Sequence, residues 1–140
     1  TVELGFEIGK GIVLNPGTDV TIAATGHLVW EALLAAEELE SDGITAEVIN
    51  IHTIKPLDEV LILESVKKTG AIVTAEEHNY MGGLGESIAG ALSKSHPTPQ
   101  EYVATQDTFG ESGTPAELME KYGLNRNSII AASKKVILRK

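Results

Sequence analysis

The sequence contains no cysteine among its 140 residues, which excludes disulfide bonds, thiolate metal ligands and a cysteine nucleophile. No apolar run reaches the length of about 20 residues that a membrane-spanning helix needs. Residues 1–10 lack the basic start and apolar stretch of a signal peptide. The chain also lacks an initiator methionine, which indicates that it was processed or excised from something longer. We therefore expect a cytoplasmic protein with no membrane partner.

Basic residues are scarce as well. The 11 Lys and Arg residues stand against 20 Asp and Glu residues, so the formal net charge at pH 7 is −9. Binding to a phosphate backbone needs clustered Lys and Arg, and here the basic residues are scattered except in the tail pairs Lys134-Lys135 and Arg139-Lys140. We expect this tail to complement a helix C-terminus, and we expect no nucleic-acid partner.

From residue 19 onward, short β-branched runs alternate with segments of helical periodicity. This alternation predicts one domain with a largely parallel sheet that is covered on both faces. An additional strand at 10–14 joins the strand at 20–25 through the turn Asn15-Pro16-Gly17, a hairpin-like start that predicts one antiparallel edge strand. The other expected strands are 46–51, 71–75 and 102–105, and the expected helices are 27–39, 56–70, a segment ending near 92, 114–123 and 127–140.

Two of these helices have marked ends or faces. Pro56 suits a first helical position, Asp58 and Glu59 suit the positive first turn, and Gly70 suits the cap. In the helix at 27–39, the stripe expected to face the core consists of Val29, Leu33 and Ala36, with Trp30 and Leu34 beside it.

The densest polar cluster is Glu76, Glu77 and His78, which follows a predicted strand, and the glycine-rich turn of Gly82, Gly83, Leu84 and Gly85 then opens a helix. Loops at the carboxyl ends of strands line the functional crevice of an open α/β sheet, free helix amides could receive an anion, and carboxylates beside an imidazole could perform acid–base chemistry. Alternatively, the glycines permit close packing while the acids orient the loop or contact a neighbouring domain. For catalysis within this chain we favour the structural interpretation and assign no catalytic residue.

Gly26 and His27 form a second candidate anion site, because they lie between a strand and a helix; a solvated surface histidine is the alternative. His52 belongs to an apparent structural turn, and Ser112 is not in the Gly-x-Ser-x-Gly spacing of a nucleophile elbow. The four histidines show no paired helical spacing with carboxylates, so no metal site is expected. Dinucleotide and Walker-type glycine motifs are also missing.

Several stretches, taken in order, resemble the C-terminal domain of the transketolase family, and together they span nearly the whole chain. The same domain occurs in deoxyxylulose-phosphate synthases and in the beta subunits of 2-oxo acid dehydrogenases, but the segment at 109–113 looks more like transketolase. The resembling stretches are 9–11 with 17–22, Ile54-Lys55-Pro56-Leu57-Asp58, Thr74-Ala75-Glu76-Glu77-His78, Gly82-Gly83-Leu84-Gly85, residues 107–115, and Tyr122-Gly123-Leu124.

The resemblance implies a three-layer α/β/α fold over residues 10–140, with a five-stranded mixed sheet and one antiparallel edge strand. Residues 1–9 would be the end of an interdomain linker. The intact enzyme would use thiamine diphosphate and Mg²⁺ to transfer two-carbon ketol units between sugar phosphates, as in the pentose phosphate pathway. The N-terminal and middle domains would hold the cofactor, and this chain alone would bind none.

The partners implied are those two cofactor-binding domains, on the same or a separate chain, and a homodimer partner. The loop from Glu76 to Gly85 would contribute to the interface. Two alternatives remain open: a stand-alone module that binds a phosphorylated metabolite at the helix starts near Gly26 and Gly83, and an assembly-forming subunit of a split enzyme.

Overall fold

The computed structural model describes residues 10–52, 56–77, 83–104 and 125–140. Within them, five strands form one sheet in the order β1-β3-β2-β4-β5, and four helices accompany it. The helix expected at 114–123 lies outside the described residues. The strands are β1 (Ile12–Asn15), β2 (Val20–Ala24), β3 (Ala46–Asn50), β4 (Ile72–Ala75) and β5 (Gln100–Val103), and the helices are α1 (Leu28–Ser41), α2 (Glu59–Thr69), α3 (Leu84–Ser95) and α5 (Arg126–Ile137).

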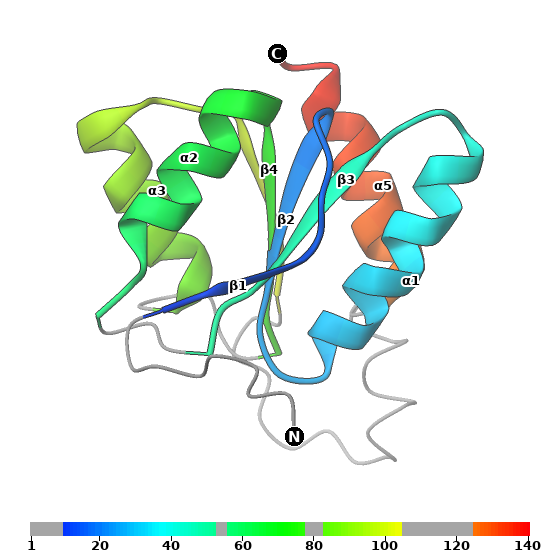
Figure 1. The fold of residues 1–140 in the computed structure, drawn as a ribbon, viewed down its shortest axis with the longest axis horizontal. Helices are drawn as coiled ribbons and strands as arrows, with labels where there is room; N and C mark the ends of the chain where they lie inside the picture. The colour runs from blue at the N-terminus through cyan, green and yellow to red at the C-terminus, as the bar shows by residue number, and fades with distance from the viewer. Residues whose placement is uncertain (1–9, 53–55, 78–82, 105–124) are drawn as a thin grey trace.

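The predicted fold class is confirmed. β2 pairs in parallel with β3 and β4, β4 pairs in parallel with β5, and β1 is the antiparallel edge strand. Helices α1 and α5 cover one face of the sheet, and α2 and α3 cover the other (Figure 1). Among the described residues, no helix is long and apolar enough to cross a membrane.

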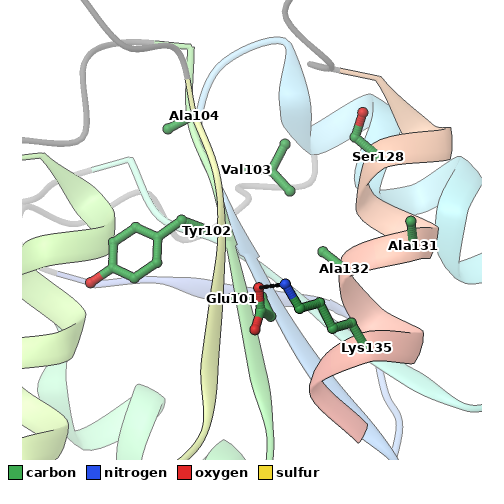
Figure 2. A pocket seen from close by; sticks show the side chains of 8 residues that line it. All are labelled: Glu101, Tyr102, Val103, Ala104, Ser128, Ala131, Ala132 and Lys135. Atoms are coloured by element: carbon green, nitrogen blue, oxygen red, sulfur yellow. Dashed lines mark ion pairs between the residues drawn. The ribbon is translucent and has the colours of Figure 1, made fainter. Parts of the chain in front are cut away.

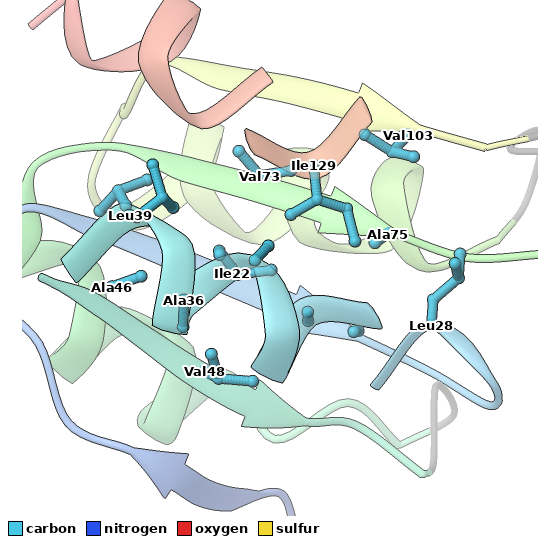
Figure 3. Close-up of a cluster of buried hydrophobic side chains, with 14 of the residues drawn as sticks. Ile22, Leu28, Ala36, Leu39, Ala46, Val48, Val73, Ala75, Val103 and Ile129 are labelled. Atoms are coloured by element: carbon cyan, nitrogen blue, oxygen red, sulfur yellow. The ribbon is translucent and has the colours of Figure 1, made fainter. Parts of the chain in front are cut away.

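Two apolar layers fill the spaces between the sheet and its helices. β2 is buried along its whole length, as expected for a central strand covered on both faces. On one face Ile22 packs in a cluster with Leu39 of α1 and Ile129 of α5 (Figure 3). On the other face Ile62 of α2 and Ile88 of α3 belong to a second cluster. Both faces of the sheet are thus packed against apolar side chains of the helices.

The prediction of a hairpin-like start is wrong in one respect: β1 pairs with β3 and not with β2. Both edges of β2 are already occupied by β3 and β4, so β1 takes the outer edge of β3. The turn between β1 and β2 therefore crosses the start of β3. There, the amide of Asn15 donates to the Ala46 carbonyl (2.8 Å), and a Cβ on Gly17 would lie 2.4 Å from the Ala46 carbonyl carbon. Only glycine fits this crossing.

Helix α2 begins at Glu59, so Pro56 is not its first residue. Asp58 is the N-cap: Oδ1 accepts from the Leu61 N–H (3.2 Å) and Oδ2 accepts from the Gly11 N–H (2.9 Å). One aspartate thereby starts the helix and anchors the beginning of β1. Gly70 ends α2 in the left-handed conformation, with φ of 76°, as the sequence predicts.

The buried face of α1 differs from the expected stripe. Val29 and Leu33 are only partly buried, and Trp30 is 64% exposed. Apolar residues surround most of this helix, so periodicity alone does not fix its orientation. Small alanines let α1 approach the sheet closely and decide which face is buried. The residues of α1 that face the core are Leu28, Ala32, Ala35, Ala36 and Leu39.

Candidate functional site

The carboxyl ends of β2, β3 and β4 meet at the lower edge of the sheet in Figure 1. After β2 the chain first adds β3 on one side and then β4 on the other side, which makes this edge a topological switch point, where open α/β sheets bind their ligands. A cavity of about 410 Å³ lies there. Its lining comes from residues 25–27 after β2, residues 50–52 around the end of β3, and Glu77 after β4.

Glu76 is buried beside this cavity and fixes the start of α3. Its Oε1 accepts from the Leu84 N–H (2.9 Å) and its Oε2 accepts from the Gly85 N–H (2.7 Å). Its own N–H donates to the Val103 carbonyl of β5 (2.9 Å). A carboxylate at a helix N-terminus is stabilised by the free amides and by the helix dipole. The amides that the sequence offered to an external anion at α3 therefore bind a carboxylate of the chain itself.

Glu77 performs the same task for α1. Its Oε1 accepts from the His27 N–H at 2.7 Å and would lie 3.0 Å from a Cβ built on Gly26, whose φ is +60°. Successive side chains at the end of a strand point to opposite faces of the sheet. For this reason the adjacent residues Glu76 and Glu77 reach helices on opposite faces. The candidate anion position at Gly26 and His27 is filled by Glu77.

The described glycines of the glycine-rich turn have different surroundings. Gly83 is the N-cap of α3. A Cβ on Gly85 would lie 2.4 Å from Cε2 of Tyr102 and 3.1 Å from Oγ1 of Thr74, so Gly85 permits close packing of α3 on β4 and β5. The predicted site residues His78 and Gly82 lie outside the described residues.

Thr25, Asn50 and Ile51 also line the cavity, although the sequence pattern assigns them no function, and the pattern places His52 in a structural turn. The signal that could have found them is positional, because each of these residues closes or follows a parallel strand. The cavity therefore combines two imidazoles, an amide and a carboxylate with backbone groups. Among the described residues, no three His, Asp or Glu side chains are grouped so that they could hold a metal ion.

A second cavity, of about 370 Å³, lies between the edge strand β5 and α5 (Figure 2). Glu101 on its wall pairs with Lys135 (3.5 Å) and with Arg139 (2.6 Å). Small side chains, including Ala131 and Ala132, form much of the remaining lining. Sequence reasoning assigned no function to this region.

The chain is thus an open α/β domain with a crevice at its switch point. Carboxylates of the chain itself bind the amides at the two helix starts on this edge of the sheet. The model of the family described as "Transketolase, C-terminal domain" matches residues 9–129. The chain belongs to this family.

Similar proteins carry this region within longer chains. Over 96% of its length the chain is 50% identical to the 6-deoxy-6-sulfo-D-fructose transketolase subunit SqwH of Clostridium sp. strain MSTE9, of which it covers 42%. Over 91% of its length it is 43% identical to a putative transketolase C-terminal section of Methanocaldococcus jannaschii, of which it covers 40%. It also resembles the solved structure of a split-gene transketolase in an inactive beta4 tetramer, with a TM-score of 0.91, 48% identity, and coverage of 95% of this chain and 44% of that one. The chain thus spans less than half the length of these relatives.

The family uses thiamine diphosphate, and the two helix starts at this edge of the sheet do not fit the charged end of that cofactor. A diphosphate seated at either helix start would meet the carboxylates of Glu76 or Glu77, which already hold the amides there. The negative charges of the diphosphate and of these carboxylates would repel each other. We therefore assign no chemical step to this cavity.

Proposed function

We propose that this chain is the C-terminal, non-cofactor-binding part of a thiamine-diphosphate-dependent transketolase that transfers two-carbon ketol units between sugar phosphates. Its membership of the family and its 50% identity to a transketolase subunit support this proposal. Within that enzyme, this chain would be either a C-terminal domain that residues 1–9 join to the cofactor-binding domains, or a subunit of a split enzyme whose cofactor-binding domains lie on a separate chain. A deoxyxylulose-phosphate synthase or a 2-oxo acid dehydrogenase is the runner-up.

The task of this domain would be to pack against the cofactor-binding domains and the homodimer partner and so help to shape the active site. One observation carries this assignment. Glu76 and Glu77, the only acids of the predicted cluster, are bound to backbone amides of α3 and α1. These hydrogen bonds fix the two glutamates in position and leave the helix amides already occupied. This arrangement suits an assembly surface better than a reactive centre.

The same observation disfavours the alternative of a stand-alone module for phosphorylated metabolites. That module would need open helix amides at α1 and α3. In this chain a phosphate would have to displace Glu77 from the His27 N–H or Glu76 from the Leu84 N–H. The displaced carboxylate would then remain nearby and repel the ligand.

The proposal is tested by the double substitution Glu77→Ala with His78→Ala in the assembled enzyme. We expect weaker association with the cofactor-binding chain or domain and a loss of ketol transfer of about ten-fold or more, because an interface contact and the cap of α1 are both removed. Sedimentation and a coupled transketolase assay measure the two effects. The control is His96→Ala, at the C-terminal end of α3 and thus at the opposite edge of the sheet. Unchanged assembly and turnover in the double variant would contradict the role given to this loop.

A further inference from the structure

Trp30 is the sole tryptophan of the chain, and its side chain is 64% exposed on the first turn of α1. It lies three residues after His27, which lines the cavity at the carboxyl edge of the sheet together with Gly26. Most large apolar side chains of the described residues are buried in the two core clusters. An exposed tryptophan is the side chain most often found as an energetic anchor of protein interfaces. Trp30 therefore makes this end of α1 a candidate docking surface.

Acidic residues flank this surface along α1. Glu31 accepts from the Arg126 N–H (2.8 Å), and Glu38 lies 3.9 Å from the Arg126 guanidinium. Glu37 and Glu40 are exposed and form no ion pair with any described residue. In a chain of net charge −9, this flank repels a second copy of itself and an anionic membrane surface. It fits a polypeptide that offers an apolar pocket with a basic rim.

The start of β1 indicates at which edge of the sheet a preceding domain would lie. Ile12 lies opposite Asn50, the last residue of β3, and the Gly11 N–H donates to Asp58 at the start of α2. The chain thus enters β1 at the carboxyl edge of the sheet, which is also the edge where α1 begins. A domain that precedes this one in a longer chain of the family would therefore reach it at the edge where α1 and Trp30 lie.

From these observations we infer that Trp30 anchors a docking surface for the domain that precedes this one in the longer relatives. This inference rests on the proposed function and adds the residue, the edge and the partner chemistry. The indole fills an apolar pocket of that domain, and basic residues around the pocket meet the acidic flank of α1. A substitution at Trp30 therefore weakens assembly without altering the core, because the side chain is exposed in the free chain.

The chain lacks cysteine, so a single thiol can report the contact. Trp30→Cys is compared with the control Leu138→Cys, which is 86% exposed and lies beyond α5 at the opposite edge. Each variant is coexpressed with the part of the Clostridium subunit that precedes the matched region, and maleimide labelling of the cysteine peptide is followed by mass spectrometry. The Clostridium part bound to its own C-terminal region serves as the positive control.

We expect labelling at position 30 to slow about ten-fold or more in the complex while position 138 is unaffected, or the Trp30→Cys variant alone to lose association. A complex in which both thiols react as fast as in the free chain would overturn the inference and leave the proposed function standing. Failure of the wild-type chain to associate at all, with the positive control intact, would contradict the proposed function as well. Slower labelling of position 30 at rising concentrations of the free chain would identify a second copy as the occupant and also overturn the inference.

Discussion

At the scale of single residues, two neighbouring glutamates illustrate how sequence chemistry can be read in two ways. A carboxylate pair after a strand and before a glycine-rich turn has the composition of a reactive site. In the structure, Glu76 caps α3 and Glu77 binds the amide that precedes α1. Their function is to position two helices relative to one end of β4, and this follows from strand alternation together with the helix starts on both faces.

The cap at Glu76 predicts a large effect of a small change. In Glu76→Gln, the side-chain amide can accept only one of the two hydrogen bonds from Leu84 and Gly85, and its NH₂ group faces the other N–H. We expect a loss of about 1–3 kcal/mol in the free energy of unfolding, because a buried donor loses its partner. Urea denaturation measures it. The control Glu86→Gln, exposed in the first turn of the same helix, should change stability by about 0.5 kcal/mol at most. Equal losses in the two variants would refute a specific cap.

Glu47 of β3 predicts a dependence of stability on pH. Burial alone would raise the pKa of its carboxyl, but hydrogen bonds from Lys68, Ser65 and the Gly17 N–H and the charge of Lys68 outweigh it, so the pKa is lowered. A folded-state pKa below the unfolded value gives stability that is present above the unfolded value and is lost as pH falls through the folded one. Stability should therefore fall on acidification below the ordinary glutamate value of 4.5.

The test compares the wild type with Glu47→Gln by chemical unfolding at neutral and acidic pH. We expect the variant to be less stable by about 1–3 kcal/mol at neutral pH, because Lys68 loses its partner and the buried network is broken. The difference should shrink as the pH falls, since the wild-type carboxylate is then protonated. A difference that stays constant or grows at low pH is incompatible with this origin. Glu40→Gln, at an exposed position of α1, is the control and should shift stability by about 0.5 kcal/mol at most.

At the scale of elements, β1 and α1 show what local sequence signals cannot predict. The turn signal at Asn15-Pro16-Gly17 correctly separates two strands, but it does not say which strand β1 joins; that depends on both edges of β2 being taken. The apolar residues of α1 predict a helix, but the alanines and not the larger side chains decide its buried face. Helix propensity and turn residues are local signals. Which strands pair, and which face of a helix is buried, depends on how all the elements pack together.

Helix α3 offers a matched pair of substitutions at glycine. Gly85→Ala would place a Cβ 2.4 Å from the Tyr102 ring, whereas a Cβ on Gly90, in the same helix, meets nothing within 4 Å. We expect Gly85→Ala to cost about 1–3 kcal/mol through overpacking and Gly90→Ala to stabilise by about 0.5–1 kcal/mol through helix propensity. Thermal unfolding of both variants checks these signs. In a Tyr102→Ala background the cost at Gly85 should fall; stabilisation by both single variants would argue against close packing at Gly85.

At the scale of the whole molecule, alternation of strands and helices predicted the parallel sheet and its covered faces, because burial of a parallel sheet requires that pattern. The ordered motifs, from Gly9 to Leu124, added the number of strands and the family. The lining of the cavity could be predicted only in part. Glu77, Gly26 and His27 stand next to strand ends and were found, whereas the pairing of Glu77 with the amide of His27 joins residues 50 positions apart and depends on the three-dimensional arrangement.

We propose that this domain contributes structure and assembly to a transketolase-family enzyme and has no cofactor site of its own. The most direct test is calorimetric titration of the purified chain with thiamine diphosphate and Mg²⁺, accompanied by a transketolase assay. We expect no saturable binding and no turnover by the chain alone, and recovery of both when a polypeptide with the cofactor-binding domains is added. Saturable binding or turnover by the chain alone would contradict the division of labour proposed here.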